Sequence, residues 1–172
     1  MVKMTSYNTP VPYVVDYSSD GGSGPSTEAW QAFAGDDARA WVSAAVAGPH
    51  WIQLDWGAGG ARSLRSYQMY CPDGLFASLN PNSWDIEGAD DPVSWDPSPP
   101  PETPEPILLS RVTGMTLALW SAQPRRNFLY TNALTVAFRY TRLTVTALNS
   151  GDLRVTINEW VVSLLGNANR LY

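Results

Sequence analysis

Short β-type segments, each followed by turn-forming residues, run through most of this sequence and limit what it can fold into. Between Trp51 and Trp56 the alternation puts Ile52, Leu54 and Trp56 on one face, and Gly57 ends the segment. Many short strands with turns between them are typical of an antiparallel sandwich, so we expect an all-β fold. Further strands are expected at residues 64–70, 83–87, 112–120, 135–138, 139–147 and 155–165.

Two segments depart from this strand pattern. Ser26 is a good N-cap for one short helix that runs through Trp30 to Ala34 and is closed by Gly35. The second segment, residues 92–106, holds half of the 14 prolines. Proline donates no backbone hydrogen bond, so we expect an extended surface insertion there, with a polyproline ligand for a partner domain as the alternative.

Length and charge narrow the possible partners. A chain of 172 residues suits one domain over residues 1–172, with its core at about residues 18–165. The net charge of −5 gives no electrostatic reason to bind nucleic acid or an anionic membrane. Cys71 is the only cysteine, which excludes an intrachain disulfide. The N-terminus lacks the apolar region of a signal peptide, and no apolar run is long enough to span a bilayer, so a soluble protein is expected.

The sequence contains no recognisable catalytic motif. One histidine and one cysteine exclude most pairs of a nucleophile with a base. Residues 21–24 form a flexible glycine-rich loop rather than a nucleophile elbow, and no cysteine or histidine spacing suits zinc. A glycosidase would need two carboxyl groups facing each other across a cleft, which a sequence alone does not test. We therefore expect a protein that is not an enzyme.

Five segments in the same order resemble the discoidin family, also called the coagulation factor 5/8 type C or galactose-binding-like family. They are residues 29–43 (AWQAFAGD followed by WVS), 51–57 (WIQLDWG), 83–95 (SWDIEGADD followed by W), 140–147 (YTRLTVTA) and 157–160 (INEW). The resemblance covers roughly residues 18–165 and implies an eight-stranded antiparallel jelly-roll sandwich with one short helix. It also implies that the ligand-binding loops gather at one end of the sandwich.

Most of the matching residues are expected to be structural. Tryptophans in or beside strands belong more often to a core than to a ligand site, and the tryptophans in question are Trp41, Trp51, Trp56, Trp84 and Trp160. Arg142 is expected to satisfy buried carbonyl groups or a carboxylate rather than to contact a sugar.

The family often holds a structural Ca²⁺ in the loop after the helix, and here the resemblance is incomplete. Asp36 and Glu159 match expected ligands, and Asp37 would be a substitute. Ala34 and Arg39 occupy two other ligand positions. Because Ca²⁺ prefers six to eight oxygen ligands, several of them anionic, we expect a degenerate site in which Arg39 pairs with a carboxylate instead of the metal.

Three loops at the end of such a fold are candidates for ligand binding: residues 20–27, 71–82 and 120–128. A sugar is held by an aromatic platform with planar polar groups around it. The candidates are Phe76 as the platform, Asp73 and Asn80 as its polar partners, Trp120 and Arg125 as a second wall, and His50 as a further contact. The alternatives are that the 71–82 loop packs onto the body, that its apolar tip contacts another protein, and that His50 is an ordinary loop residue.

These features favour a non-catalytic glycan-binding domain. The setting we expect is a phage or virus particle, where a tail, baseplate or head appendage would contact host-surface polysaccharide; otherwise the chain would act outside the cell in a larger assembly. One alternative is a purely structural virion protein that binds no glycan and docks on other subunits, or on itself, through residues 161–165 and 171–172. Another is a binding module of a carbohydrate-active enzyme.

Overall fold

A computed structural model describes residues 4–8, 13–21, 27–35, 38–71, 74–96, 102–129, 136–164 and 170–171 of the chain. Its strands are β1 Val14–Tyr17, β2 Trp41–Val42, β3 His50–Asp55, β4 Leu64–Tyr70, β5 Pro81–Ala89, β6 Ile107–Val112, β7 Arg125–Leu129, β8 Tyr140–Leu148, β9 Thr156–Ile157, β10 Glu159–Leu164 and β11 Arg170–Leu171. Its helices are the 3-10 helices η1 Ala29–Phe33, η2 Gly74–Leu79 and η3 Pro92–Trp95 and the α-helix α1 Leu117–Ala122.

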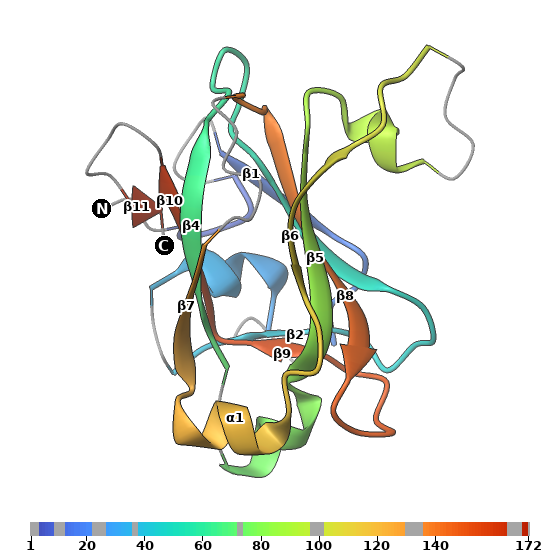
Figure 1. The fold of residues 1–172 in the computed structure, drawn as a ribbon, viewed down its shortest axis with the longest axis vertical. Coiled ribbons are helices and arrows are strands. Elements are labelled where there is room, and N and C mark those ends of the chain that lie inside the picture. Colours follow the sequence, from blue (N-terminus) through green and yellow to red (C-terminus); the bar gives the residue numbers. More distant parts are fainter. Residues whose placement is uncertain are drawn as a thin grey trace.

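Two antiparallel sheets face each other, as the sequence predicts (Figure 1). One sheet has the strand order β1-β3-β8-β5-β6 and the other has the order β11-β10-β4-β7. Apart from the two-residue β11 at one edge, the two sheets hold eight strands in the described part of the chain, which is the number that the family resemblance implies. A separate ribbon, β2 with β9, joins segments more than a hundred residues apart through the pair Trp41 and Ile157. The all-β sandwich is therefore confirmed.

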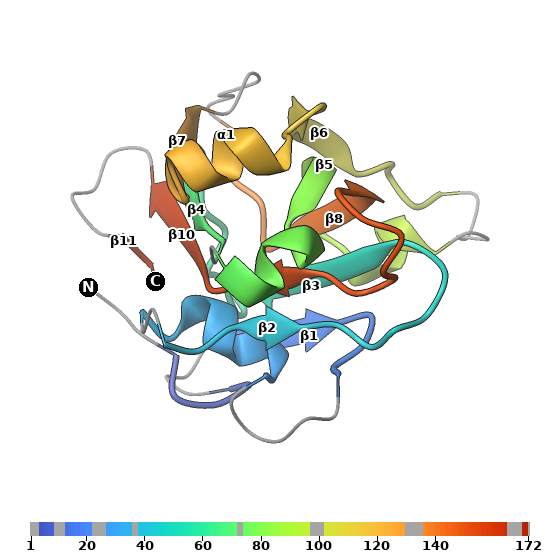
Figure 2. The ribbon, with the colours of Figure 1, turned by 90° about the horizontal axis from the view of Figure 1, so that it is seen from below.

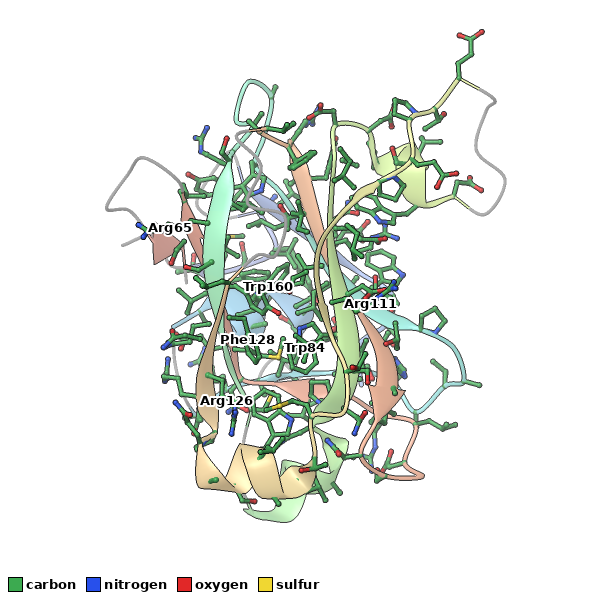
Figure 3. All side chains as sticks on the ribbon, viewed as in Figure 1. Arg65, Trp84, Arg111, Arg126, Phe128 and Trp160 are labelled. Atoms are coloured by element: carbon green, nitrogen blue, oxygen red, sulfur yellow. The ribbon has the colours of Figure 1, made fainter. Side chains whose placement is uncertain are left out.

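Aromatic side chains fill the space between the sheets. Trp84, Phe128 and Trp160 point into this layer (Figure 3), with the Trp84 and Phe128 ring centroids 5.2 Å apart and nearly perpendicular. The Trp84 Nε1–H donates to the Tyr67 hydroxyl at 2.9 Å, and that hydroxyl lies 3.2 Å from Ser110 Oγ, so these three polar atoms are paired inside the core. The expectation of core tryptophans is confirmed at Trp41, Trp56, Trp84 and Trp160.

Trp51 is the exception among the predicted core tryptophans, since it is only half-buried. Ile52 and Leu54 of β3 are fully buried between the sheets. Because side chains alternate along a strand, Trp51 must lie on the outer face, where its ring packs against the guanidinium of Arg142. The assignment of Trp51 to the core is wrong for this reason.

The segment 112–120 is not the strand expected from its apolar residues. β6 ends at Val112, and α1 begins after Thr116, whose Oγ1 accepts a hydrogen bond from Leu119 N at 3.4 Å. A threonine cap of this kind favours a helix, and the helical turn brings Trp120 to the buried side. The strand β7 lies mostly in the predicted loop 120–128, and β6 follows the predicted insertion 92–106 in a segment where only Val112 was expected to belong to a strand.

The other helix and strand boundaries differ less from those expected from the sequence. The helix η1 is a 3-10 helix with Glu28 rather than Ser26 at its N-cap, and Gly35 follows it with a φ of 62°, as a helix-closing glycine should. Phe138 makes an isolated bridge with Arg62 instead of a strand. The polyproline stretch 97–101 lies outside the described residues. No helix in the described part of the chain has the length and apolar character needed to cross a membrane.

Candidate functional site

Several loops gather at one end of the sandwich, which we call the loop end: residues 42–50, η2, α1 and the β8–β9 turn at residues 149–155. Figure 1 shows α1, η2 and this turn at the bottom, and Figure 2 shows the same end face-on. Backbone hydrogen bonds connect the segments, with Cys71 N donating to Pro124 O at 3.1 Å and Gly21 N to Val42 O at 2.7 Å. The described parts of all three predicted loops therefore meet here; residues 22–26 lie outside the described set.

Asn80 and Trp120, two predicted glycan contacts, are buried in the structure. Trp120 is 1% exposed, donates from Nε1 to Pro81 O at 2.9 Å and stacks on Trp84 with 5.9 Å between centroids. A ring in that position has no open face for a sugar. The expectation fails for Trp120 because the residue sits on a helix that turns it inward rather than on a strand end.

Phe76 and Asp73 stay predictions. The backbone of Phe76 belongs to η2, but its side chain lies outside what the structure describes, and so does Asp73. Asp36 and Asp37, two of the three predicted calcium ligands, are also outside the described residues.

Arg125 and Glu159 come together on the outer face of the four-stranded sheet. Arg125 Nη1 donates to the carboxylate of Glu159 and, at 3.0 Å, to Gln68 Oε1, and the guanidinium lies 4.8 Å from the centre of the Tyr70 ring. The Glu159 side chain is 3% exposed. Its predicted role was metal binding, and the predicted role of Arg125 was sugar binding; here each is the other's partner.

This arrangement does not fit a calcium ion at Glu159. The guanidinium of Arg125 already supplies the positive charge that a metal would bring to Glu159, and the predicted pair of Arg39 with a carboxylate stays a prediction. Among the described residues, no group of three or more carboxylate, histidine or cysteine side chains is placed to hold a metal. With Asp36 and Asp37 outside the described residues, the degenerate calcium site stays a prediction.

A pocket of about 260 Å³ opens at the loop end between residues 46–50 and the β8–β9 turn. Its walls combine aliphatic side chains, among them Val46, Val145, Leu148 and Leu153, with His50 and Ser150. Of the predicted glycan contacts, His50 lines this pocket. The pocket follows from the register of β3 with β8, which pairs His50 with Val145 at the end of the sheet.

The His50 ring is neutral at physiological pH. The residue is 3% exposed, and burial lowers the pKa of the imidazole, although a hydrogen bond to the Leu153 backbone opposes the shift. Nδ1 is buried and has no hydrogen-bond partner in the described structure. The pocket wall therefore contains a polar ring that carries no charge.

A second cluster lies on the outer face of the five-stranded sheet, and sequence reasoning missed it. The Arg142 guanidinium lies between two indoles, 3.9 Å from the ring centre of Trp51 and 4.4 Å from that of Trp95. Its Nε and Nη2 donate to Gln53 Oε1, so it satisfies a side-chain carbonyl, and burial lowers its pKa to about 10. Trp95 is fixed in turn by donating to Glu87 at 2.7 Å. Side chains alternate between the two faces of β3, and the apolar Ile52 marks its inner face. This alternation was the sequence signal that could have placed Trp51 on the outer face.

No protein-family profile matches the sequence, and no curated protein matches it. Solved structures do match in fold. Chitosan-binding module 1 from a chitosanase/glucanase of Paenibacillus sp. IK-5 has 17% identity and a TM-score of 0.62, with 87% of this chain and 93% of that chain covered. CpGH89CBM32-5 from Clostridium perfringens, in complex with GalNAc-beta-1,3-galactose, has 13% identity and a TM-score of 0.63, covering 87% and 94%.

A third match is the family 32 carbohydrate-binding module of NanJ from Clostridium perfringens, in complex with galactose. It has 13% identity and a TM-score of 0.59, with 87% of this chain and 92% of that chain covered. Each match spans nearly the whole of both chains, at an identity that reports on fold alone. Together with the sheet order and the buried tryptophans, these likenesses show that the chain has the discoidin, or galactose-binding-like, fold of carbohydrate-binding modules.

Proposed function

We propose that this chain is a non-catalytic glycan-binding domain whose ligand binds at the loop end. The observation that carries the proposal is the pocket beside His50, on a fold whose solved relatives include modules in complex with sugars. Phe76 and Asp73 in the neighbouring loop remain the proposed platform and polar partner. Arg125 and Asn80 would then act by supporting the loops.

The chemistry of the described residues supports the non-catalytic part. Cys71 is fully buried, and burial raises the pKa of its thiol well above the usual value, so it is not a thiolate nucleophile. Four carboxylates are held in ion pairs: Asp55, Asp85, Asp152 and Glu159 pair with Arg139, Arg111, Arg154 and Arg125. At Asp152 the hydrogen bond from Arg154 lowers the pKa of the carboxyl group, which makes it a poor general acid.

The proposed setting is a phage or virus particle that contacts host-surface polysaccharide, with a module of a carbohydrate-active enzyme as the alternative that the structural relatives favour. A structural role without a glycan is the other candidate, and the 74% exposure of Leu129 favours it. Residues 161–162, which were expected to dock on other subunits, are buried and do not serve that purpose. Leu164 is partly buried against the core, and the apolar candidates at 165 and 171–172 lie outside the described side chains.

Glycan-array screening followed by titration calorimetry tests the proposal. The wild-type chain is expected to bind at least one glycan with a dissociation constant of about 1 mM or tighter. Phe76→Ala is expected to weaken that binding, whereas Leu129→Ala, a change at an exposed apolar residue away from the loop end, should leave it unchanged. If no glycan binds at millimolar concentration, the structural role is favoured, and native mass measurement then reports whether the chain assembles.

A further inference from the structure

The pocket at the loop end has aliphatic walls. Val46 and Leu153 are 49% and 46% exposed, so two of the large apolar side chains that this protein leaves in water lie at the same pocket. Val145 and Leu148 add further aliphatic surface. No aromatic side chain other than the His50 imidazole lines the pocket among the described residues. The described lining therefore has no aromatic ring that could stack on a sugar, but it has a small aliphatic surface.

The polar groups of the pocket carry no unpaired charge. Asp152 is the one carboxylate in the described lining, and both of its oxygens accept hydrogen bonds from Arg154, at 3.0 and 2.7 Å. Ser150 Oγ accepts from Asp152 N at 3.1 Å, which leaves its own proton to donate. The His50 ring adds an unpartnered Nδ1. This lining suits a neutral ligand that has hydroxyl groups.

The size of the pocket limits the ligand to a single unit. Pockets for drug-sized molecules enclose about 300–1,000 Å³. At about 260 Å³, this pocket falls below that range and holds one sugar ring rather than an oligosaccharide. The space beside Gly48 and Gly151 in the pocket lining is open, since a side-chain carbon added at either would meet no atom within 4 Å.

We infer that this pocket receives one neutral sugar unit through a methyl group, carried either by an N-acetyl substituent or by a 6-deoxy carbon. The inference rests on the proposed glycan-binding function and names its ligand class. The methyl group packs against Val46 and Leu153, and the ring hydroxyls face Ser150. Burying one methyl group is worth about fourfold in affinity.

The test uses sugar pairs that differ in the methyl-bearing group: N-acetylglucosamine with glucose, L-fucose with L-galactose, and L-rhamnose with L-mannose. Binding is measured by ligand-observed NMR titration. The methyl-bearing member of at least one pair is expected to bind fourfold or more tightly, with the strongest saturation transfer on its methyl protons. The first pair reports on the N-acetyl group, and the other two report on the 6-deoxy carbon.

Two variants and two matched controls locate the contact. Val46→Thr exchanges a methyl for a hydroxyl at nearly constant shape and is expected to remove the preference, whereas Val136→Thr, at an equally exposed valine elsewhere, should keep it. Ala147→Trp places a large ring at the pocket and is expected to weaken binding at least tenfold. Ala118→Trp, on the exposed side of α1, is expected to leave binding unchanged.

The outcomes separate this inference from the proposed function. Equal affinity for both members of every pair overturns the methyl contact, even if Ala147→Trp blocks binding. Glycan binding that Ala147→Trp leaves intact overturns the pocket assignment while the glycan-binding function stands. No binding of any glycan overturns both.

Discussion

Replacing Arg125 by Met should destabilise the protein strongly, because it leaves the carboxylate of Glu159 buried without its cation. The Glu159 side chain is 3% exposed and that of Arg125 is 35% exposed. Breaking a buried ion pair from one side costs about 3–5 kcal/mol. Since water reaches part of the guanidinium, we expect the lower end, about 3 kcal/mol, which corresponds to a fall in Tm of about 6–12 °C for a chain of this size.

Urea denaturation at pH 7 measures this effect. The double variant Arg125→Met with Glu159→Leu removes both charges and should recover at least about 2 kcal/mol relative to Arg125→Met. Arg111→Met is the matched control: the Arg111 side chain is 60% exposed, so losing its surface pair with Asp85 should lower the unfolding free energy far less than Arg125→Met does.

The reasoning would be refuted by a loss below about 1 kcal/mol for Arg125→Met, or by additive losses in the double variant. Either result would mean that the carboxylate is solvated or finds another partner. In that case the argument that arginine takes the place of a metal at Glu159 would also lose its basis.

Three further predictions concern buried groups. Cys71 should react with a thiol reagent only after denaturation, because it is 0% exposed and burial raises its pKa; modification of the native protein within minutes would contradict this. Burial lowers the folded-state pKa of His50 below 6.5, so the unfolded chain binds the proton more tightly than the folded chain does. The free energy of unfolding should therefore fall as pH drops below 6.5. In urea titrations, His50→Gln should lack that part of the pH dependence. Gly88→Ala should lower the unfolding free energy by about 1–3 kcal/mol, since the new carbon would lie 2.5 Å from the buried Phe138 ring, and an unchanged Tm would show that the ring moves freely.

The inner faces of the strands were predictable because burial leaves a period-two record in the sequence. Ile52 and Leu54 mark one side of β3, and the same rule places Trp84 and Ile86 together on β5. Trp51 was misassigned because a tryptophan in a strand was expected to be buried, whereas only every second side chain of β3 faces the core. The local pattern was correct, and it put Trp51 outside.

The segment 112–120 shows where a local pattern is insufficient. Its apolar residues fit a strand or a helix about equally well, and the decision depends on Thr116, which can cap a helix. The outcome matters for the site, because the helix buries Trp120 and removes it from the set of sugar contacts. A capping hydrogen bond of one side chain thus decides whether an aromatic ring is available to a ligand.

The contacts of the candidate site were beyond sequence reasoning because they depend on register between distant strands. Tyr70 is paired with Arg125 on one side and with Glu159 on the other, and only this double pairing brings the guanidinium to the carboxylate. His50 reaches the pocket because it is opposite Val145. A slip of one residue in either register would send each side chain to the other face of its sheet.

The wall of the pocket is held by a residue that no motif marks. Asn149 begins the β8–β9 turn, and its Nδ2 lies within hydrogen-bond distance of Asn80 O, Pro81 O and Met115 O, at 3.0, 3.2 and 2.9 Å. One side chain therefore ties the turn to the end of η2, to β5 and to the segment before α1. A wall fixed in this way loses little conformational entropy when a ligand binds. A small entropy cost matters most for the affinity of a ligand that makes few contacts. A pocket of this size can select a single sugar unit only if its walls are ordered before the ligand binds. The hydrogen bonds of Asn149 fix the wall formed by the β8–β9 turn.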